Sequence, residues 1–216
     1  MRDLGEKQKA LLTELTDRFP ELKTIECDIA AAYEALQELF SNDGKLLIAG
    51  NGGSAADADH IVGELMKGFC KRRRITEDFV KELSNIDSES GAVLGANLQG
   101  ALPAIALTNH TALSTAFAND VSGALTFAQQ VYGYGKPGDV LLAISTSGNS
   151  KNVCYAAVTA KALGMKVIAF TGIPGGALAR TADIPVRVPE QETYKVQELQ
   201  LPIYHCWCLM LEEYFF

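Results

Sequence analysis

The sequence predicts an α/β protein, a three-layer α/β/α sandwich around a parallel sheet of about five strands. Two observations support this fold class. From residue 45 onward, short apolar runs alternate with longer amphipathic stretches, which is typical of successive βαβ units. Two of these runs end in turns rich in glycine and serine, and each turn precedes a stretch of helical character. This order predicts right-handed crossovers and therefore parallel strands.

A helical extension is expected before the sheet. Residues 6–41 have helical character and contain no glycine, and Phe19-Pro20 divides them into two segments because proline interrupts a helix. We expect residues 1–43 to form this N-terminal extension and residues 44–216 to form the α/β domain.

The remaining elements follow from the alternating pattern. The expected strands are 45–49, 103–107, 139–144, 166–170 and 184–188. The expected helices are 54–68, 111–118, 123–132, 150–163 and 195–214. The residues from about 75 to 100, with scattered Asp, Glu, Ser and Gly, predict an insertion made of one helix and a loop.

Composition excludes several classes of protein. A chain of 216 residues with 48% hydrophobic content can bury a full core. The N-terminus is charged and no apolar run approaches the roughly 20 residues that span a bilayer, so we expect a cytoplasmic protein without a membrane partner. Five cysteines without CxxC spacing argue against a disulfide framework and a zinc finger, and predict reduced core residues.

A net charge of −7 argues against nucleic acid as a partner, because duplex binding depends on many Lys and Arg contacts to phosphates. One basic cluster stands out, at Lys67 and Lys71–Arg74. Two interpretations of it stay open: a solvated helix end whose cations complement the helix dipole, or a direct contact to an anionic ligand.

The two turns are the segments Gly50–Ser54 and Ser145–Ser150. Each follows a buried strand and opens a helix, so backbone N–H groups are free at a helix N-terminus. Serine and threonine hydroxyls add further donors. The sequence therefore predicts a site for a phosphate monoester. The donors are expected from Ser54, Ser145, Thr146, Ser147 and Ser150.

Other interpretations of the turns are weaker. Residues 50–55 fit the dinucleotide pattern G-x-G-x-x-A, but Lys71–Arg74 stands where that fingerprint needs an acidic residue about 20 positions later. No Walker P-loop pattern occurs. For the second turn, a structural role with Ser150 as a helix cap stays open.

Together with Asp57–Glu64 and Gln197–His205, the turns resemble the sugar isomerase (SIS) domain family, and within it the phosphoheptose isomerases. The resemblance runs through most of the chain. It implies a flavodoxin-like five-stranded domain and an intramolecular oxidoreductase that interconverts sedoheptulose 7-phosphate and glycero-manno-heptose 7-phosphate through an enediol. It also implies a homotetramer in which the N-terminal helices pack between subunits and active sites lie at interfaces.

The resemblance assigns roles to individual residues. It implies one divalent metal ion per site, usually zinc, bound by His60, Glu64, Gln197 and His205. Glu64 and His205 also match the proposed catalytic base and acid. The sugar phosphate is expected to contact the two turns, Gln197 and an Asn-Asp pair. The full set of substrate-binding residues is Asn51, Gly52, Gly53, Ser54, Asn119, Asp120, Ser145, Thr146, Ser147, Ser150 and Gln197.

Three departures from the family pattern leave the exact sugar open. Leu65–Gly68 replaces a Gly-Arg pair that commonly follows the glutamate, and Tyr194-Lys195 replaces an Asp-Arg pair before Gln197. The insertion at about 75–100 is longer than usual and is expected to lead towards the active-site face.

The residues also make chemical sense on their own. His60 and Glu64 are four apart, so on a helix they share one face. His205 lies in an apolar segment, where a core histidine is the alternative. Gln197 and His205 are eight apart, about 12 Å along one helix. Both reach one ion only if their side chains converge, the helix starts late or subunits share ligands.

Two alternative functions remain. A noncatalytic SIS sugar-phosphate sensor or replication-initiator-binding adaptor needs no acid, base or metal, and the presence of His60, Glu64, Gln197 and His205 argues against it. An amino-sugar phosphate isomerase or lactyl ether lyase shares the turns but gives no reason for this set.

Overall fold

The computed structural model describes residues 4–216. Its centre is a sheet of five parallel strands in the order β2-β1-β3-β4-β5, the flavodoxin-like order. The strands are β1 (Leu46–Ala49), β2 (Ala104–Ala106), β3 (Val140–Ile144), β4 (Lys166–Gly172) and β5 (Ile184–Val188). All five predicted strands are confirmed.

The helices on the sheet are α3 (Gly53–Met66), α6 (Thr111–Phe117), α7 (Thr126–Tyr134), α8 (Lys151–Ala162), α9 (Gly176–Thr181) and α10 (Thr193–Phe215). The helix expected at 123–132 starts later, because a π-helical turn (Ala118–Ser122) and a 3-10 turn (Gly123–Leu125) follow α6. The sequence analysis missed the short helix α9.

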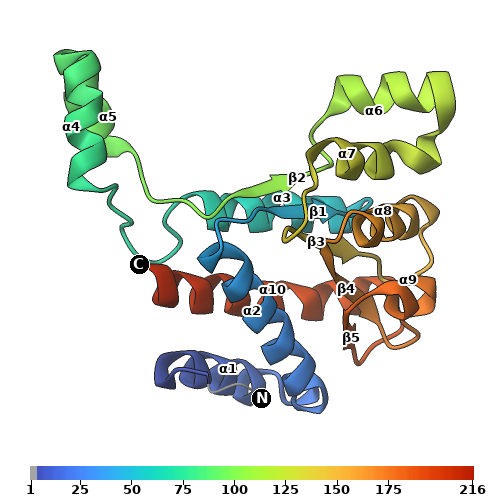
Figure 1. Ribbon diagram of the computed structural model, residues 1–216. Helices are drawn as coiled ribbons and strands as arrows, with labels where there is room; N and C mark the ends of the chain where they lie inside the picture. Colours follow the sequence, from blue (N-terminus) through green and yellow to red (C-terminus); the bar gives the residue numbers. More distant parts are fainter. Residues whose placement is uncertain (1–3) are drawn as a thin grey trace.

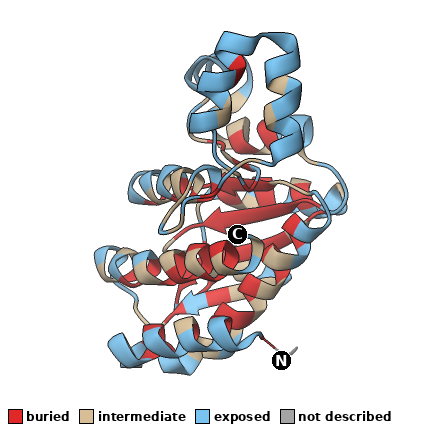
Figure 2. Ribbon diagram, turned by 90° about the vertical axis from the view of Figure 1, so that its left-hand side faces the viewer, coloured by how far each residue is buried: buried red, intermediate tan, exposed pale blue. Residues whose placement is uncertain are grey.

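The N-terminal segment folds as predicted, with α1 (Glu6–Arg18), a 3-10 helix (Pro20–Ile25) and α2 (Glu26–Ser41). Side chains of β1 alternate between two cores: Leu46 and Ile48 pack with α2, α3 and α10, whereas Leu47 packs with α7 and α8. Helices therefore cover both faces of the sheet (Figure 1). The buried residues concentrate on the strands and on the inner sides of the helices (Figure 2).

The insertion differs from the prediction, because it holds two helices, α4 (Glu77–Ile86) and α5 (Ser88–Asn97). Thr76 caps α4 by accepting a hydrogen bond from the Phe79 N–H, and Asp87 caps α5 by accepting one from the Ser90 N–H. These two caps explain why the polar segment forms a helical hairpin rather than one helix and a loop.

The hairpin also lies at the other end of the sheet. Helix α3 runs back along the sheet from the first turn, and the Leu65 carbonyl near its end accepts a hydrogen bond from Leu102, just before β2. The hairpin that follows α3 projects from the body beside the amino ends of the strands (Figure 1). The hairpin therefore lies at the opposite end of the sheet from the two turns, and its relation to the active-site face stays a prediction.

Two further predictions concern membranes and cysteines. Within residues 4–216, no helix is both long and apolar enough to cross a membrane. Cys206 and Cys208 are buried free thiols, but Cys27 and Cys70 are exposed, so the expectation of core cysteines holds for α10 and not for the chain as a whole.

Candidate active site

The first turn places the start of α3 against α10. Gly52 has a positive φ of 56°, which glycine adopts at little cost. A Cβ at Gly53 would collide with the amide nitrogen of Gln197, so a larger residue at this position would displace that side chain of α10. Among the described residues no side chain caps the N-terminus of α3, although the N–H groups of Ser54 and Ala55 already donate to the carbonyls of Asn51 and Gly52. The positive end of the helix dipole at this turn still favours an anion.

The two turns meet because β1 and β3 are neighbouring strands. Asn51 and Asn152 exchange two amide hydrogen bonds, of 2.9 and 2.8 Å, and so connect the first turn to the start of α8. Asn152 was not predicted to matter, since a single Asn inside a helix start carries little signal. The pair fixes the distance between the two helix N-termini.

The second turn is held by its own side chains. The Ser145 hydroxyl donates to Ser150 at 3.0 Å, and the Asn149 side chain accepts from the Ala177 N–H at 3.1 Å. Ser150 is the N-cap residue of α8, but its side chain makes no capping hydrogen bond. In the first turn of α8 the Val153 N–H donates to the Asn152 side chain instead, at 3.0 Å. Ser145 is buried, whereas Thr146 is half-buried and Ser147 is exposed. The N-terminus of α8, with its positive helix dipole, thus also lies at this edge of the sheet and favours an anion.

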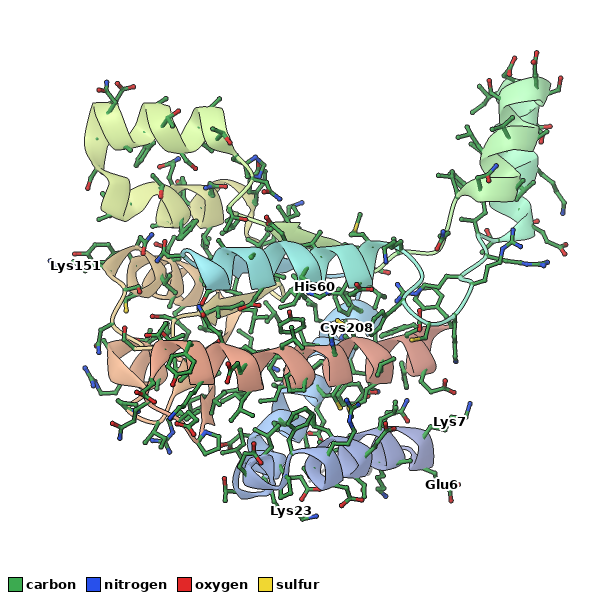
Figure 3. The ribbon with its side chains drawn as sticks, turned by 180° about the vertical axis from the view of Figure 1, so that it is seen from behind. Glu6, Lys7, Lys23, His60, Lys151 and Cys208 are labelled. Atoms are coloured by element: carbon green, nitrogen blue, oxygen red, sulfur yellow. The ribbon has the colours of Figure 1, made fainter. Side chains whose placement is uncertain are left out.

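A cluster of acid–base groups forms between α3 and α10. His60 Nε2 lies 3.3 Å from Glu64 Oε1 and 3.4 Å from His205 Nε2. Figure 3 shows His60 on α3, next to α10. The prediction that His60 and Glu64 share one face is confirmed, and α10 brings His205 to the same place. The Lys67 ammonium also approaches Glu64, at 3.3 Å.

Tyr204 fixes the ring of His60. Its hydroxyl lies 3.0 Å from His60 Nδ1 and donates to Asp57 Oδ1 at 3.3 Å. Because a carboxylate only accepts, the hydroxyl donates to Asp57. In the tautomer that leaves Nε2 free to bind a metal ion, it also accepts from His60 Nδ1–H, whereas in the other tautomer His60 Nε2–H donates to Glu64. Burial raises the pKa of Tyr204, and the nearby Asp57 raises it further, so this donor keeps its proton. In the first tautomer the lone pair of His60 Nε2 points at Glu64 and His205.

The surroundings of His205 favour the neutral form of its imidazole. Burial lowers its pKa below the usual value, and the neighbouring His60 lowers it further, while Glu64 opposes both effects. The ring of Phe69 lies over it, with the ring centroids 5.5 Å apart. A neutral ring can donate one N–H and accept at the other nitrogen, as proton transfer between oxygens requires.

Buried Arg73 connects the C-terminal end of α3 to α10, next to this cluster. Its guanidinium donates to the backbone carbonyls of Leu65 at 2.7 Å and Glu64 at 3.0 Å, and to the Glu212 carboxylate at 2.9 Å. Glu212 also accepts from the N–H groups of Phe69, Cys70 and Lys71. Two interpretations of the basic cluster were open. For Arg73 the first is correct, because this cation contacts the C-terminal carbonyls of α3, although it is buried rather than solvated.

Two predicted residue sets lie elsewhere. Gln197 packs on the first turn, two helical turns of α3 before His60, and α10 is continuous from Thr193, so a late helix start does not bring it to the cluster. Asn119 donates to Asp120 at 2.9 Å in the exposed π-helical turn after α6. That turn belongs to the α6–α7 lobe (Figure 1).

The side chains of His60, Glu64 and His205 meet part of what a metal ion requires. Two nitrogen ligands of a tetrahedral zinc ion are about 3.3 Å apart for Zn–N bonds of about 2.0–2.1 Å. The His60–His205 and His60–Glu64 spacings match this value. As placed, however, residues 4–216 contain no group of three or more His, Cys, Asp or Glu side chains that could hold an ion. A metal site here requires one of these side chains to rotate.

Comparisons with known proteins identify the family of this chain. The SIS domain family matches residues 88–172. The phosphoheptose isomerase of Geotalea daltonii is 40% identical over 188 residues, covering 87% of this chain and 84% of that protein. A probable phosphoheptose isomerase of Thermoplasma acidophilum is 40% identical over 187 residues, covering 87% of this chain and 88% of that protein.

Solved structures give the same result. Phosphoheptose isomerase GmhA from Neisseria gonorrhoeae superposes with a TM-score of 0.72 and 32% identity, over 96% of this chain and 98% of that one. A phosphoheptose isomerase from Francisella tularensis superposes with a TM-score of 0.75 and 33% identity, over 93% of each chain. Fold, turns and whole-length similarity agree, and the chain belongs to the phosphoheptose isomerase family of SIS-domain proteins.

Proposed function

We propose that the protein is an isomerase that converts sedoheptulose 7-phosphate into glycero-manno-heptose 7-phosphate. The observation that carries the proposal is the convergence of Glu64 and His205 around His60, in a chain 40% identical to a phosphoheptose isomerase. A noncatalytic sensor has no need of a carboxylate and two imidazoles in contact.

The reaction moves one proton between adjacent carbons. Glu64 takes a proton from C1 of the ketose while His205 donates a proton to the C2 oxygen, which gives a neutral enediol. His205 then recovers a proton from the C1 hydroxyl, and Glu64 returns its proton to C2. The sum of these steps is an aldose, with no change in total atoms or electrons.

The turns hold the phosphate and thereby orient the sugar. The N-termini of α3 and α8, with their positive helix dipoles, and the hydroxyls of Ser54, Thr146 and Ser147 would surround one anion between β1 and β3. We assign Gln197 to the substrate rather than to a metal, because it packs on the first turn. Binding energy from the phosphate end positions the distant carbonyl carbon for proton transfer.

A divalent metal ion, with zinc as the expected element, is part of the proposal. His60, Glu64 and His205 are the residues that would hold it, and their spacing and the contact of His60 Nδ1 with the Tyr204 hydroxyl support this assignment. Such an ion polarises a carbonyl oxygen. The homotetramer and the cytoplasmic location stay predictions.

The experiment follows the conversion of sedoheptulose 7-phosphate by NMR in D₂O. We expect the wild-type protein to form the aldose phosphate and to incorporate solvent deuterium at the proton-transfer carbons. Glu64→Gln should lower kcat by about 10²–10⁴-fold, because an amide cannot accept the carbon-bound proton. Its affinity for the sugar phosphate should change little, since the turns are intact.

Glu21→Gln is the matched control, because this carboxylate is exposed on the N-terminal 3-10 helix and should leave kcat unchanged. If the wild-type protein shifts the sugar resonances without converting the sugar, the proposed reaction is wrong. If Glu64→Gln loses binding instead of turnover, Glu64 is not the base.

A further inference from the structure

The α4–α5 hairpin has no partner within its own chain. Gly91 is its one buried residue among the helical positions that the structure describes. Several of its large apolar side chains are exposed: Phe79, Ile86, Val93, Leu94 and Leu98. Isolated helices of this length are marginal in water, so a hairpin without a core of its own needs a surface to cover it.

The seam between the two helices explains this exposure. A Cβ at Gly91 would lie 2.6 Å from the Ser84 backbone, and one at Gly95 would lie 2.8 Å from a Val80 methyl group. Glycines at this spacing allow α4 and α5 to pack closely, backbone against backbone. Most large apolar side chains therefore point outward instead of filling the seam.

A groove lies at the base of the hairpin. Its cavity volume is about 840 Å³, and its lining includes apolar Ile75, Val80 and Leu98. Arg72 and Arg74 are exposed in the same lining. The groove thus combines an apolar floor with a basic rim.

The tip of the hairpin complements this groove, because it combines an exposed apolar side chain with acidic residues. Ile86 is 84% exposed, and Asp87 and Glu89 follow it directly. The segment from Glu77 to Glu89 carries five acidic residues and a single lysine, Lys81, which pairs with Asp78. An apolar side chain flanked by carboxylates matches a groove with an apolar floor and arginines at its rim.

We propose that the hairpin docks on a second copy of this chain, so that the tip of each hairpin enters the basal groove of the other. A ten-residue helix is about 15 Å long, so two hairpins lying antiparallel place each tip at the other base. A two-fold axis makes both contacts identical and closes the interface. This contact is separate from the N-terminal helices and does not depend on the proposed function.

Sedimentation velocity over a range of protein concentrations tests this contact. We expect Ile86→Asp and Arg74→Glu each to weaken self-association at least tenfold, or to reduce the assembly to a smaller one. Glu89→Arg should do the same, and combining it with Arg74→Glu should restore association because the charges are exchanged. Val158→Asp on α8, which replaces another exposed β-branched apolar side chain, is the matched control and should leave hairpin association unchanged.

Circular dichroism checks that each variant folds; an exposed residue should not alter the spectrum. The proposal is wrong if the wild-type protein stays a single chain at all concentrations, which points to a different protein as partner. It is also wrong if Ile86→Asp associates like the wild type, or if the charge exchange fails to restore association.

Discussion

At the scale of single residues, the orientation of His60 depends on two neighbours that the sequence analysis did not assign. The Tyr204 hydroxyl lies 3.0 Å from His60 Nδ1, and Asp57 accepts from Tyr204. Burial raises the pKa of Asp57, while the Tyr204 hydrogen bond and the charge of His60 lower it. Asp57 Oδ2 is buried without a hydrogen-bond partner among the described residues. The series of hydrogen bonds from His60 through Tyr204 therefore ends at the Asp57 carboxyl group.

We expect Tyr204→Phe to lower kcat about 10–100-fold, because His60 is then free to adopt the tautomer that blocks Nε2. KM should change little, since the phosphate turns are untouched. The measurement is a pH profile of kcat and KM. Tyr33→Phe is the control: that hydroxyl is also buried but has no partner in the described chain, and its loss should leave kcat unchanged. Equal effects of both variants would contradict the role of Tyr204.

At the scale of elements, one buried ion pair joins the end of α3 to α10. Burial by itself raises the pKa of Glu212, but hydrogen bonds from the Phe69 and Cys70 N–H groups and from Arg73 outweigh it and hold the pKa below the usual value. The ionised Glu212 carboxylate therefore stabilises the contact between α3, which carries Glu64, and α10, which carries His205.

We expect Glu212→Gln to lower the free energy of unfolding at pH 7 by roughly 3 kcal/mol, because Arg73 is left buried without its charge partner. A lowered folded pKa means that this stabilisation is present above the unfolded pKa of about 4.3 and is lost as pH falls through the folded value. Wild type and variant should therefore converge in acid. Urea unfolding between pH 7 and 3 measures this.

Glu213→Gln is the control for this series, because that neighbouring carboxylate pairs with Lys7 and Lys71 nearer the surface. Its effect should be much smaller at every pH. A constant difference between wild type and Glu212→Gln down to pH 3 would show that the Glu212 charge is not what stabilises the fold.

At the scale of the whole molecule, Trp207 joins the N-terminal helices to the sheet. Its indole N–H donates to the Ile29 carbonyl of α2 at 3.0 Å, and its ring centroid lies 5.0 Å from that of Phe170 in β4. Trp207, Ile29 and Phe170 belong to the same core cluster. Residues 6–41 therefore share a core with the sheet on which they pack.

Trp207→Ala should lower the free energy of unfolding by about 4 kcal/mol through the cavity that it leaves. Because the core is shared, all helices and strands should still unfold in one transition in urea, followed by far-UV circular dichroism. Tyr132→Ala, an exposed aromatic residue on α7, should cost far less. Separate unfolding of the N-terminal helices would contradict a shared core.

Local pattern was sufficient for much of this fold. The apolar runs at 139–144 and 166–170 predicted strands correctly, because a strand that is buried on both faces is apolar throughout. Helix α9 was missed because its six residues are too few to show a helical period. The second helix of the insertion was missed because its glycines, which make the seam with α4, are locally unfavourable in a helix.

The sequence by itself determined the α/β class, the five strands, both glycine- and serine-rich turns and the shared face of His60 and Glu64, because each depends on neighbours within a few residues. Only the tertiary structure decided that Tyr204 orients His60, that Arg73 is buried under Glu64, that Asn152 joins the two turns and that the hairpin lies away from them. These contacts join positions far apart in the chain, and their partners are chosen by how α3, α8 and α10 pack on the sheet.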